Sequence, residues 1–269
     1  MELQALLERP LIIVAHPDDE SVGCGILLQR AREPQVVFCT DGAPRASQYW
    51  EAYGSRERYG EVRRQEARSA LRMAGVENPI FLSEGKDGQC FVDQDLFLAV
   101  PNALHRIFDI VEDYAPTALL THAYEGGHPD HDACAFLAYS AGKELGISVW
   151  EFPLYHRKPQ GEFCVQQFLI SDGSETRLSP TQQELERKQR MISQYNSQKN
   201  VLAQFDPAVE CFRPMPAYDF SNAPHPGTLN YESWGWSMTG KQLCAAFCAC
   251  SQKRSLLDLA LLPPTGIAA

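Results

Sequence analysis

Apolar runs alternate with helical patterns over the first 153 residues of the chain. Short apolar runs bounded by turn residues predict buried strands at 11–15, 35–40, 80–82, 118–121 and 147–152. Apolar residues at helical spacing predict helices at 19–32, 55–74, 96–114 and 129–143. Strands that alternate with helices are typical of a mostly parallel sheet. We therefore predict an α/β fold with helices on both faces of the sheet.

The pattern changes after Pro153. We expect an edge or hairpin strand at 163–170, a polar helix at 180–194 and a wrapping loop with short strands at 205–239. A second helix at 241–250 and a surface tail at 251–269 are expected to follow. We predict one domain over residues 1–269. It consists of a core, 1–153, and an irregular C-terminal extension, 154–269.

Two polar clusters follow predicted strands. Residues 16–20, His-Pro-Asp-Asp-Glu, come directly after the strand at 11–15. Residues 128–132, His-Pro-Asp-His-Asp, follow the strand at 118–121. The carboxyl edge of a parallel sheet is where α/β proteins bind ligands. Carboxylates packed this closely repel one another unless a positive charge lies among them, and a metal ion is the simplest candidate.

The first cluster contains two candidate metal ligands. His16 and Asp19 are three residues apart where strand gives way to helix, so both side chains lie on one face. His131 supplies a third ligand if the two strands are neighbours. A His-Asp-His set with an open position is typical of metal-dependent hydrolysis by an activated water.

Other residues of the clusters suit the same chemistry. Asp18 is placed beside the metal as a general base. His128 is a candidate for donating a proton to a leaving amine or for stabilising an oxyanion. Asp130 is a natural hydrogen-bond partner behind a histidine ring.

Each of these residues also has a simpler interpretation. His16 suits a turn, and Asp18 and Asp19 suit a helix N-terminus. We interpret His122 as a buried residue near the core and Glu20 as a support for the loop. Three histidines without such neighbours are interpreted as structural or surface residues: His105, His156 and His225. Two clusters at two strand ends favour the metal hypothesis over these interpretations.

Composition narrows the class of protein. The net charge of −10 over 269 residues argues against a nucleic-acid partner. We expect no signal peptide, and no apolar run approaches the roughly 20 residues of a membrane span. The nine cysteines include no CxxC pair, which favours a reducing cytoplasm. We expect the four cysteines within apolar runs to be buried: Cys24, Cys39, Cys134 and Cys164. We expect the C-terminal group to lie on an apolar helix face: Cys244, Cys248 and Cys250.

Other motifs are incomplete or missing. Gly23 and Gly25 begin a GxGxxG pattern, but Leu28 occupies the place of the third glycine. The sequence contains no phosphate-binding GxxxxGK[ST] loop and no GxSxG nucleophile elbow.

Ala15-His-Pro-Asp-Asp-Glu20 and His128-Pro-Asp-His131 resemble the two signatures of the PIG-L/LmbE family of metal-dependent de-N-acetylases. Thr40-Asp-Gly42 and Arg63-Arg-Gln-Glu66 resemble the family more loosely. The resemblance covers about the first 150 residues. It implies a Rossmann-like α/β sheet, with His16, Asp19 and His131 as zinc ligands, Asp18 as the base and His128 as an acid or electrostatic partner.

Candidate substrate contacts lie around this centre. We expect Arg63 to contact substrate, although a solvated helix face paired with Glu61 or Glu66 is equally plausible. Asp87 is a candidate for binding a sugar hydroxyl, and Asp41 and Arg45 for lining the cleft.

Two aromatic features bear on the same cleft. Tyr49 and Trp50 lie on an aromatic loop that suits either a sugar face or the core. The family's tyrosine before HPDH is Gly126 here, which leaves Tyr124 as its nearest replacement.

The function implied is zinc-dependent removal of an N-acetyl or N-acyl group from an amino sugar or an N-acetylglucosamine-type conjugate, with Fe²⁺ or another divalent metal as the alternative ion. The expected partner is a small N-acetylated sugar or glycoconjugate. Two alternatives remain: hydrolysis of a non-sugar amide or thiol conjugate, and a non-catalytic binding module that contains a metal.

Overall fold

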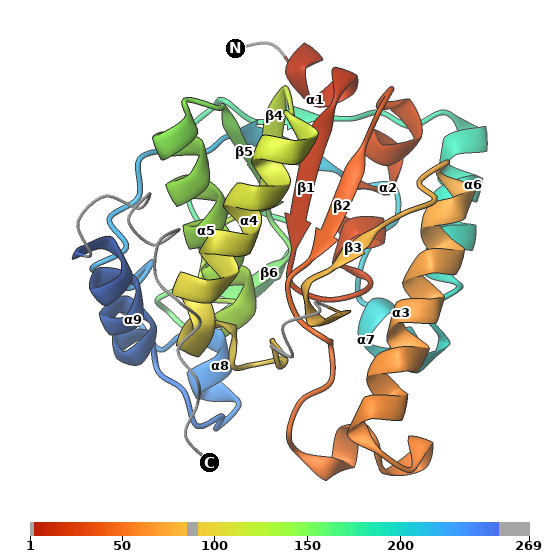
Figure 1. Ribbon diagram of the computed structural model, residues 1–269. Coiled ribbons are helices and arrows are strands. Elements are labelled where there is room, and N and C mark those ends of the chain that lie inside the picture. The colour runs from red at the N-terminus through yellow and green to blue at the C-terminus, as the bar shows by residue number, and fades with distance from the viewer. Residues whose placement is uncertain (1–2, 85–90, 253–269) are drawn as a thin grey trace.

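A seven-stranded sheet forms the centre of the computed structural model, which describes residues 3–84 and 91–252 (Figure 1). Its strands are β1 (Pro10–Val14), β2 (Gln35–Phe38), β3 (Ile80–Phe81), β4 (Ala118–His122), β5 (Val149–Phe152), β8 (Thr176–Arg177) and β9 (Cys211–Pro214). The order across the sheet is β3-β2-β1-β4-β5-β9-β8. The five strands from β3 to β5 are parallel, and β9 and β8 are antiparallel additions. The predicted α/β fold with a mostly parallel sheet is confirmed.

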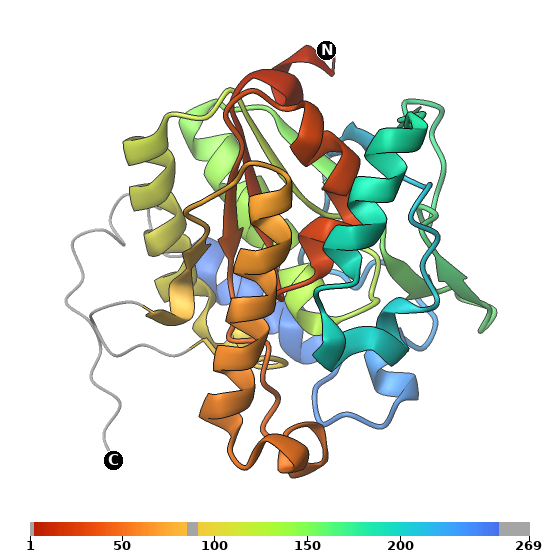
Figure 2. The same cartoon turned by 90° about the vertical axis from the view of Figure 1, so that its right-hand side faces the viewer.

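Helices cover both faces of this sheet (Figures 1 and 2). One face carries α1 (Gln4–Glu8), α2 (Asp19–Arg30), α3 (Arg56–Met73) and α6 (Gln182–Ile192). The other carries α4 (Val100–Tyr114), α5 (Pro129–Leu145) and α9 (Gly240–Gln252). None of the helices in the described ranges is long and apolar enough to cross a membrane.

The strand sequences explain this double covering. Leu11 and Ile13 of β1 pack into the core beneath α4 and α5, whereas Ile12 and Val14 pack into the core beneath α2 and α3. Side chains of a strand alternate between the faces, so a sheet buried on both sides needs an unbroken apolar run. The run at 10–14 meets that requirement.

Local signals set the helix ends. Ser55 caps α3 by accepting the backbone N–H of Arg58, and Thr181 and Glu184 form a capping box at the start of α6. Gly146 ends α5 with a left-handed φ of 69°, which costs glycine little. The predicted helix at 96–114 begins with a 3₁₀ segment, Leu96–Ala99, before α4.

The C-terminal half contains more structure than its sequence pattern indicates. The strand expected at 163–170 is limited to β7 (Phe163–Val165), which pairs with β6 (Tyr155–Arg157) outside the main sheet. The expected wrapping loop contains β9 and a short helix, α8 (Asn230–Ser233). Another short helix, α7 (Lys199–Leu202), follows α6. Nearly all of the expected surface tail lies outside the described residues, and the single-domain assignment stays a prediction.

The strand order places the two polar clusters together. β1 lies between β2 and β4, and the chain leaves β1 toward β2 on one side and reaches β4 on the other. Such a reversal opens a crevice at the carboxyl ends of the two central strands. The turn after β1 and the start of α5 after β4 both lie at this crevice.

Candidate metal centre

The turn after β1 brings His16 and Asp19 together. The backbone N–H of His16 donates to Asp19 Oδ2 at 2.8 Å, and His16 Nδ1 lies 3.3 Å from the same oxygen. Both side chains are buried, at 6% and 5% exposure. The turn therefore presents one ring nitrogen and one carboxylate to a common point.

His131, in the first turn of α5, reaches that point from the other side. Its Nε2 lies 3.3 Å from Asp19 Oδ1, and its ring centroid is 5.3 Å from that of His16. This Nε2 is buried without a hydrogen-bond partner among the described residues. A divalent ion would satisfy it, and two imidazoles with a carboxylate are donors that zinc and iron both accept. The residues present therefore fit a metal.

The charges of these groups support one another. Burial alone would raise the pKa of Asp19, but His131, His122 and His16 hold it well below its usual value. Burial alone would lower the pKa of His16, but Asp93 and Asp19 raise it well above its usual value. Asp19 is therefore ionised and available as a ligand.

Asp130 lies behind His16. Its Oδ2 is 3.1 Å from His16 Nε2, and it also accepts the backbone N–H groups of Gln94 and Leu96. This contact leaves His16 Nδ1 directed toward Asp19. A carboxylate behind a histidine ring fixes the tautomer and orientation that a ligand needs.

Asp18 lies beside the candidate ligands in a strained conformation. Its φ of 137° is rare for a residue with a Cβ, and such strain is concentrated at functional sites. Its Oδ2 accepts a hydrogen bond from Arg63 Nη2 at 2.8 Å. Burial raises the pKa of Asp18 to about 8, and the charge of Arg63 acts in the opposite direction.

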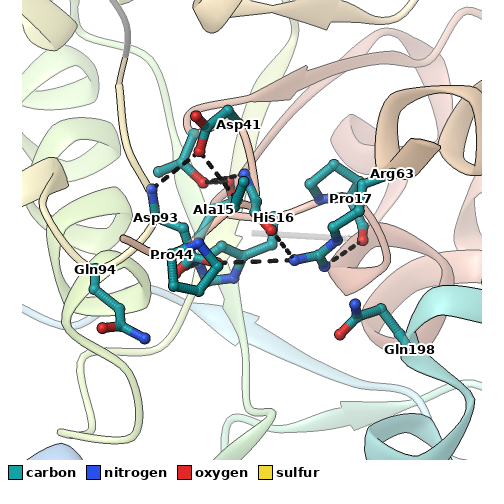
Figure 3. A network of polar contacts seen from close by, with 12 residues as sticks. Ala15, His16, Pro17, Asp41, Pro44, Arg63, Asp93, Gln94 and Gln198 are labelled. Carbon is teal, nitrogen blue, oxygen red and sulfur yellow. Dashed lines mark hydrogen bonds and ion pairs between the residues drawn. The ribbon is translucent and has the colours of Figure 1, made fainter. Parts of the chain in front are cut away.

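Arg63 is buried rather than solvated, so the helix-face interpretation is wrong. Its guanidinium donates to the carbonyl of Pro17 at 2.8 Å (Figure 3). It also donates to the carbonyl of Gly42 at 2.6 Å and to Asp18. The two glutamates that could have paired with it have other partners: Glu61 accepts from Arg64 and Gln65, and Glu66 from Ser197. Gly42 has a φ of 62°, and a Cβ there would lie 2.8 Å from the guanidinium.

His128 caps α5 from the other side of the centre. Its Nδ1 accepts the backbone N–H of Asp130 at 3.1 Å, so the neutral ring carries its proton on Nε2. Burial lowers the pKa of His128 well below its usual value, and neighbouring His16 and His131 act in the same direction. The ring is thus a neutral hydrogen-bond donor in this arrangement.

Sequence reasoning missed the position of two residues. Asp93 Oδ1 lies 3.4 Å from His16 Nε2 and 3.6 Å from His128 Nε2, yet nothing in its local sequence indicates this position. His122, at the end of β4, is more than a near-core residue. It stacks on His131 with ring centroids 4.0 Å apart, and its Nε2 lies 3.4 Å from Asp19. The position of His122 at the end of a strand next to β1 was the feature of the sequence that could have indicated a role at this site.

The other candidate substrate residues lie apart from the centre. Asp41 is buried and accepts from the backbones of Ala43 and Asp93 and from Arg56 (Figure 3). The side chain of Arg45 is 71% exposed and pairs with Asp95. Neither lines the cavity described below.

The remaining candidates fall outside the site in different ways. Asp87 lies outside the described residues. Tyr124 is in the core, where its hydroxyl donates to the carbonyl of Asn222 at 2.8 Å. Tyr124 is therefore not a replacement for the missing family tyrosine.

A cavity of about 680 Å³ opens onto the centre. Its polar lining includes His16, Asp18, Asp19, Arg63, Asp93, Gln94, His128 and Gln198. Gln94 and Gln198 lie at opposite sides of the polar network in Figure 3. The volume is within the range of about 300–1,000 Å³ that small-molecule sites occupy.

Several known proteins resemble this chain. A 1D-myo-inositol 2-acetamido-2-deoxy-alpha-D-glucopyranoside deacetylase from Mycobacterium leprae is 30% identical over 168 residues, which covers 52% of each chain. A probable N-acetyl-alpha-D-glucosaminyl L-malate deacetylase 2 from Bacillus subtilis is 30% identical over 132 residues, which covers 47% of this chain and 57% of that protein. The chain thus spans about half the length of the curated relatives it matches.

Solved structures share the fold. A deacetylase triple mutant of the teicoplanin biosynthetic pathway has a TM-score of 0.60 at 21% identity, and the match covers 78% of this chain and 99% of that one. The N,N'-diacetylchitobiose deacetylase from Pyrococcus horikoshii has a TM-score of 0.52 at 19% identity, over 80% and 88% of the two chains. Residues 11–142 match the family described as GlcNAc-PI de-N-acetylase, and they include both polar clusters. These residues therefore form a PIG-L family domain.

Proposed function

We propose that this protein is a metal-dependent hydrolase that removes an N-acetyl or related N-acyl group from an amino sugar or an N-acetylglucosamine-type conjugate. The relatives named above support the reaction class, because both are deacetylases of N-acetylated glucosamine conjugates. One observation carries the proposal. Ring nitrogens of His16 and His131, which lie on segments far apart in the sequence, converge on Asp19. The buried carboxyl group of Asp18 lies beside them, and His16, Asp18 and Asp19 line the cavity.

We assign the metal to His16 Nδ1, a carboxylate oxygen of Asp19 and His131 Nε2. Zinc is the ion we favour, and Fe²⁺ is the alternative. A divalent ion held there supplies a Lewis acid and lowers the pKa of a coordinated water. Asp130 keeps the ring of His16 in the orientation that this assignment requires.

Asp18 is the residue we assign to proton transfer. It accepts a proton from the water that attacks the amide carbonyl, and Arg63 holds its carboxylate in place. The same carboxyl group then returns the proton to the departing amine, so water and amide become acetate and amine. His128 donates its Nε2–H to the developing oxyanion, because its Nδ1 is occupied by the N–H of Asp130.

We also propose a reducing compartment such as the cytoplasm. All the cysteines that lie in the described ranges are free thiols, including the buried Cys24, Cys39, Cys134 and Cys164. This property is usual where disulfides are not maintained.

The first experiment combines metal analysis with an activity screen. Purified protein is analysed for bound zinc and iron, then assayed for acetate release from a panel of N-acetyl sugars and N-acetylglucosamine conjugates. We expect turnover that a chelator abolishes and that added zinc or iron restores. Turnover that is unaffected by complete metal removal would contradict the proposal.

Replacement of Asp18 by Asn tests the assigned base. We expect kcat to fall by about 10²–10⁴-fold with the metal content unchanged, because Asn keeps the shape but accepts no proton. Asp113→Asn, on the exposed face of α4, is the matched control and is expected to retain full activity. An Asp18→Asn protein with full turnover and bound metal would show that another group is the base.

A further inference from the structure

The C-terminal half of the chain contributes an aromatic surface to the cavity. We define the aromatic wall as Tyr155, Phe163, Phe205, Trp234 and Trp236, all of which line the cavity. Their rings lie near one another: the centroids of Tyr155 and Trp234 are 6.0 Å apart, and those of Trp234 and Trp236 are 5.0 Å apart. The wall is assembled from β6, β7, the end of α8 and the loops after α7 and α8.

Exposed apolar side chains are concentrated at this cavity. Six large apolar side chains are exposed in the part of the chain that the structure describes. Four of them line the cavity: Tyr49, Phe163, Val201 and Trp234, at 38%, 39%, 52% and 45% exposure. Exposed apolar residues scattered singly need no explanation, but a contiguous group marks a binding surface. The aromatic wall is therefore part of the surface with which the cavity binds its ligand.

The aromatic wall extends from the candidate metal centre to the mouth of the cavity. Trp236 contacts the ring of His128 edge-on at 5.1 Å, and the ring of Tyr155 lies 5.3 Å from that of His131. His131 is only 2% exposed, whereas Phe163 and Trp234 are open to solvent. A molecule whose reacting group lies at the bottom thus contacts aromatic rings along its path outward.

From this surface we propose that the aromatic wall binds an apolar aglycone, alkyl or aromatic, carried by the N-acylated amino sugar. The inference rests on the proposed function and narrows its substrate class. The acyl group that is removed lies at the bottom of the cavity, so the part that reaches the mouth is what the sugar carries. The polar lining, with Arg63, Asp93, Gln94 and Gln198, remains for the sugar hydroxyls.

The kinetic test compares three groups of substrates. The methyl and octyl glycosides of N-acetylglucosamine vary the aglycone, N,N'-diacetylchitobiose provides a polar extension, and methyl glycosides with acetyl, butanoyl or octanoyl groups vary the acyl chain. We expect kcat/KM to rise about tenfold or more from methyl to octyl glycoside, as roughly two buried methylene groups would produce. The gain is expected in KM, with octyl glycoside kept below its micelle concentration.

Variants locate the preference on the wall. We expect Trp234→Ala and Phe163→Ala to reduce the octyl-to-methyl ratio of kcat/KM at least threefold. Leu98→Ala is the matched control, because Leu98 is 67% exposed and outside the cavity lining. It keeps both the ratio and the rate. An unchanged ratio in both wall variants would overturn the proposal. A larger gain with chitobiose than with octyl glycoside, or a gain along the acyl series alone, would do the same.

A binding measurement separates this inference from the proposed function. Octyl 2-amino-2-deoxyglucoside, the expected product, is titrated while tryptophan fluorescence is followed, because Trp234 and Trp236 belong to the wall. We expect at least tenfold tighter binding than for the methyl glycoside, and loss of that difference in Trp234→Ala. If no acetate is released from any substrate but this difference persists, the proposed function fails and the wall assignment stands. If acetate is released but the octyl and methyl glycosides react equally well, the proposed function stands and the wall assignment fails.

Discussion

At the scale of single residues, Arg63 holds Asp18, the proposed base, in place. Its buried guanidinium holds Asp18 and the carbonyls of Pro17 and Gly42 at the same time, so it joins α3 to the turn after β1 and to the loop after β2. Because the planar guanidinium carries several N–H donors in fixed positions, this one side chain can satisfy all three acceptors at once. Arg63 therefore positions Asp18, whatever contact it makes with substrate.

Replacement of Arg63 tests this positioning role. We expect Arg63→Met to lower kcat at least tenfold and to destabilise the protein by about 3–5 kcal/mol, because the buried Asp18 loses its partner. Arg63→Lys keeps the charge and retains more stability, but it cannot make all three contacts. Urea unfolding and steady-state kinetics measure the two effects.

The neighbouring Arg64 supplies the control. It forms ion pairs with Glu61 and Glu84 at the surface, so Arg64→Met is expected to change stability by about 1 kcal/mol or less. Equal effects of the Met substitutions at 63 and 64 would contradict the positioning role.

At the scale of elements, the extension supports the helix that carries Asp19. α2 has a kink at Cys24, where φ is −146° and the helical hydrogen bonds are interrupted. Glu210, just before β9, accepts the freed N–H groups of Ile26 and Leu27 at 2.5 and 3.0 Å. Lys188 of α6 pairs with the same carboxylate at 2.7 Å, and both side chains are buried. One carboxylate therefore serves as a cap for the second half of α2.

Removal of this cap is expected to cost much of the stability. Glu210→Ala leaves Lys188 as a buried unpaired charge and two backbone donors without acceptors, a loss of about 3–5 kcal/mol. Lys188→Met combined with Glu210→Ala removes the unpaired charge and is expected to recover part of that loss. Urea denaturation at pH 7 measures all three proteins. A single variant as stable as the parent would show that Glu210 has no capping role.

The contact of α2 with α6, which lie side by side in Figure 2, is expected to depend on pH. Arg30 donates to both carboxylate oxygens of Glu184, and these hydrogen bonds, together with those from Thr181, lower the pKa of Glu184 to about 2. A depressed carboxyl pKa stabilises the fold above pH ~4.5, and the contribution is lost as pH falls toward 2.

Arg30→Ala is therefore expected to lower the free energy of unfolding by about 1 kcal/mol at neutral pH, because the pair is partly exposed. The difference from the parent should shrink between pH ~4.5 and the lowest pH at which both proteins fold. Urea unfolding over this range measures it. A difference that grows on acidification would contradict the assignment.

The predicted elements succeed where the pattern is local. The strands and helices expected in the first 153 residues lie within a few residues of those positions, because each is a buried apolar run or an amphipathic helix. The helix α1 was not predicted, since its five residues are too few to show a helical period. The short strands β6, β8 and β9 have no such pattern, since two to four residues define no period and their partners are distant in sequence.

At the scale of the whole molecule, the extension completes the site. Tyr195 donates to Glu20 behind Asp19, Ser197 donates to Glu66 of α3, and Trp236 contacts His128. The candidate metal centre is thus enclosed by residues from both halves of the chain. A bound ion is expected to stabilise the entire fold by mass action.

Metal binding should therefore raise the melting temperature. At a free zinc concentration of about 100 times Kd, the gain is about 2.7 kcal/mol. For a chain of this size, that corresponds to roughly 5–10 °C. Calorimetry with and without chelator measures the shift. We expect His131→Ala to abolish it and His105→Ala, on the exposed face of α4, to retain it. Metal content is measured in each sample, to confirm that the chelator has removed the ion. A protein that has lost its metal but melts at the same temperature as the metal-bound form would contradict the proposal.

The sequence by itself determined the alternation of strands and helices, the position of both polar clusters at strand ends, and the residues that suit a metal. These features are local, since each signature occupies at most six consecutive residues. Only the tertiary structure decided that Arg63 is buried against Asp18, that Asp93 and His122 join the centre, and that Asp41 and Arg45 stay apart from it. It also decided that aromatic residues between 155 and 236 share one cavity. Such contacts join residues as far apart in the sequence as Asp19 and His122, and chain folding brings them together without leaving a periodic signal in either segment.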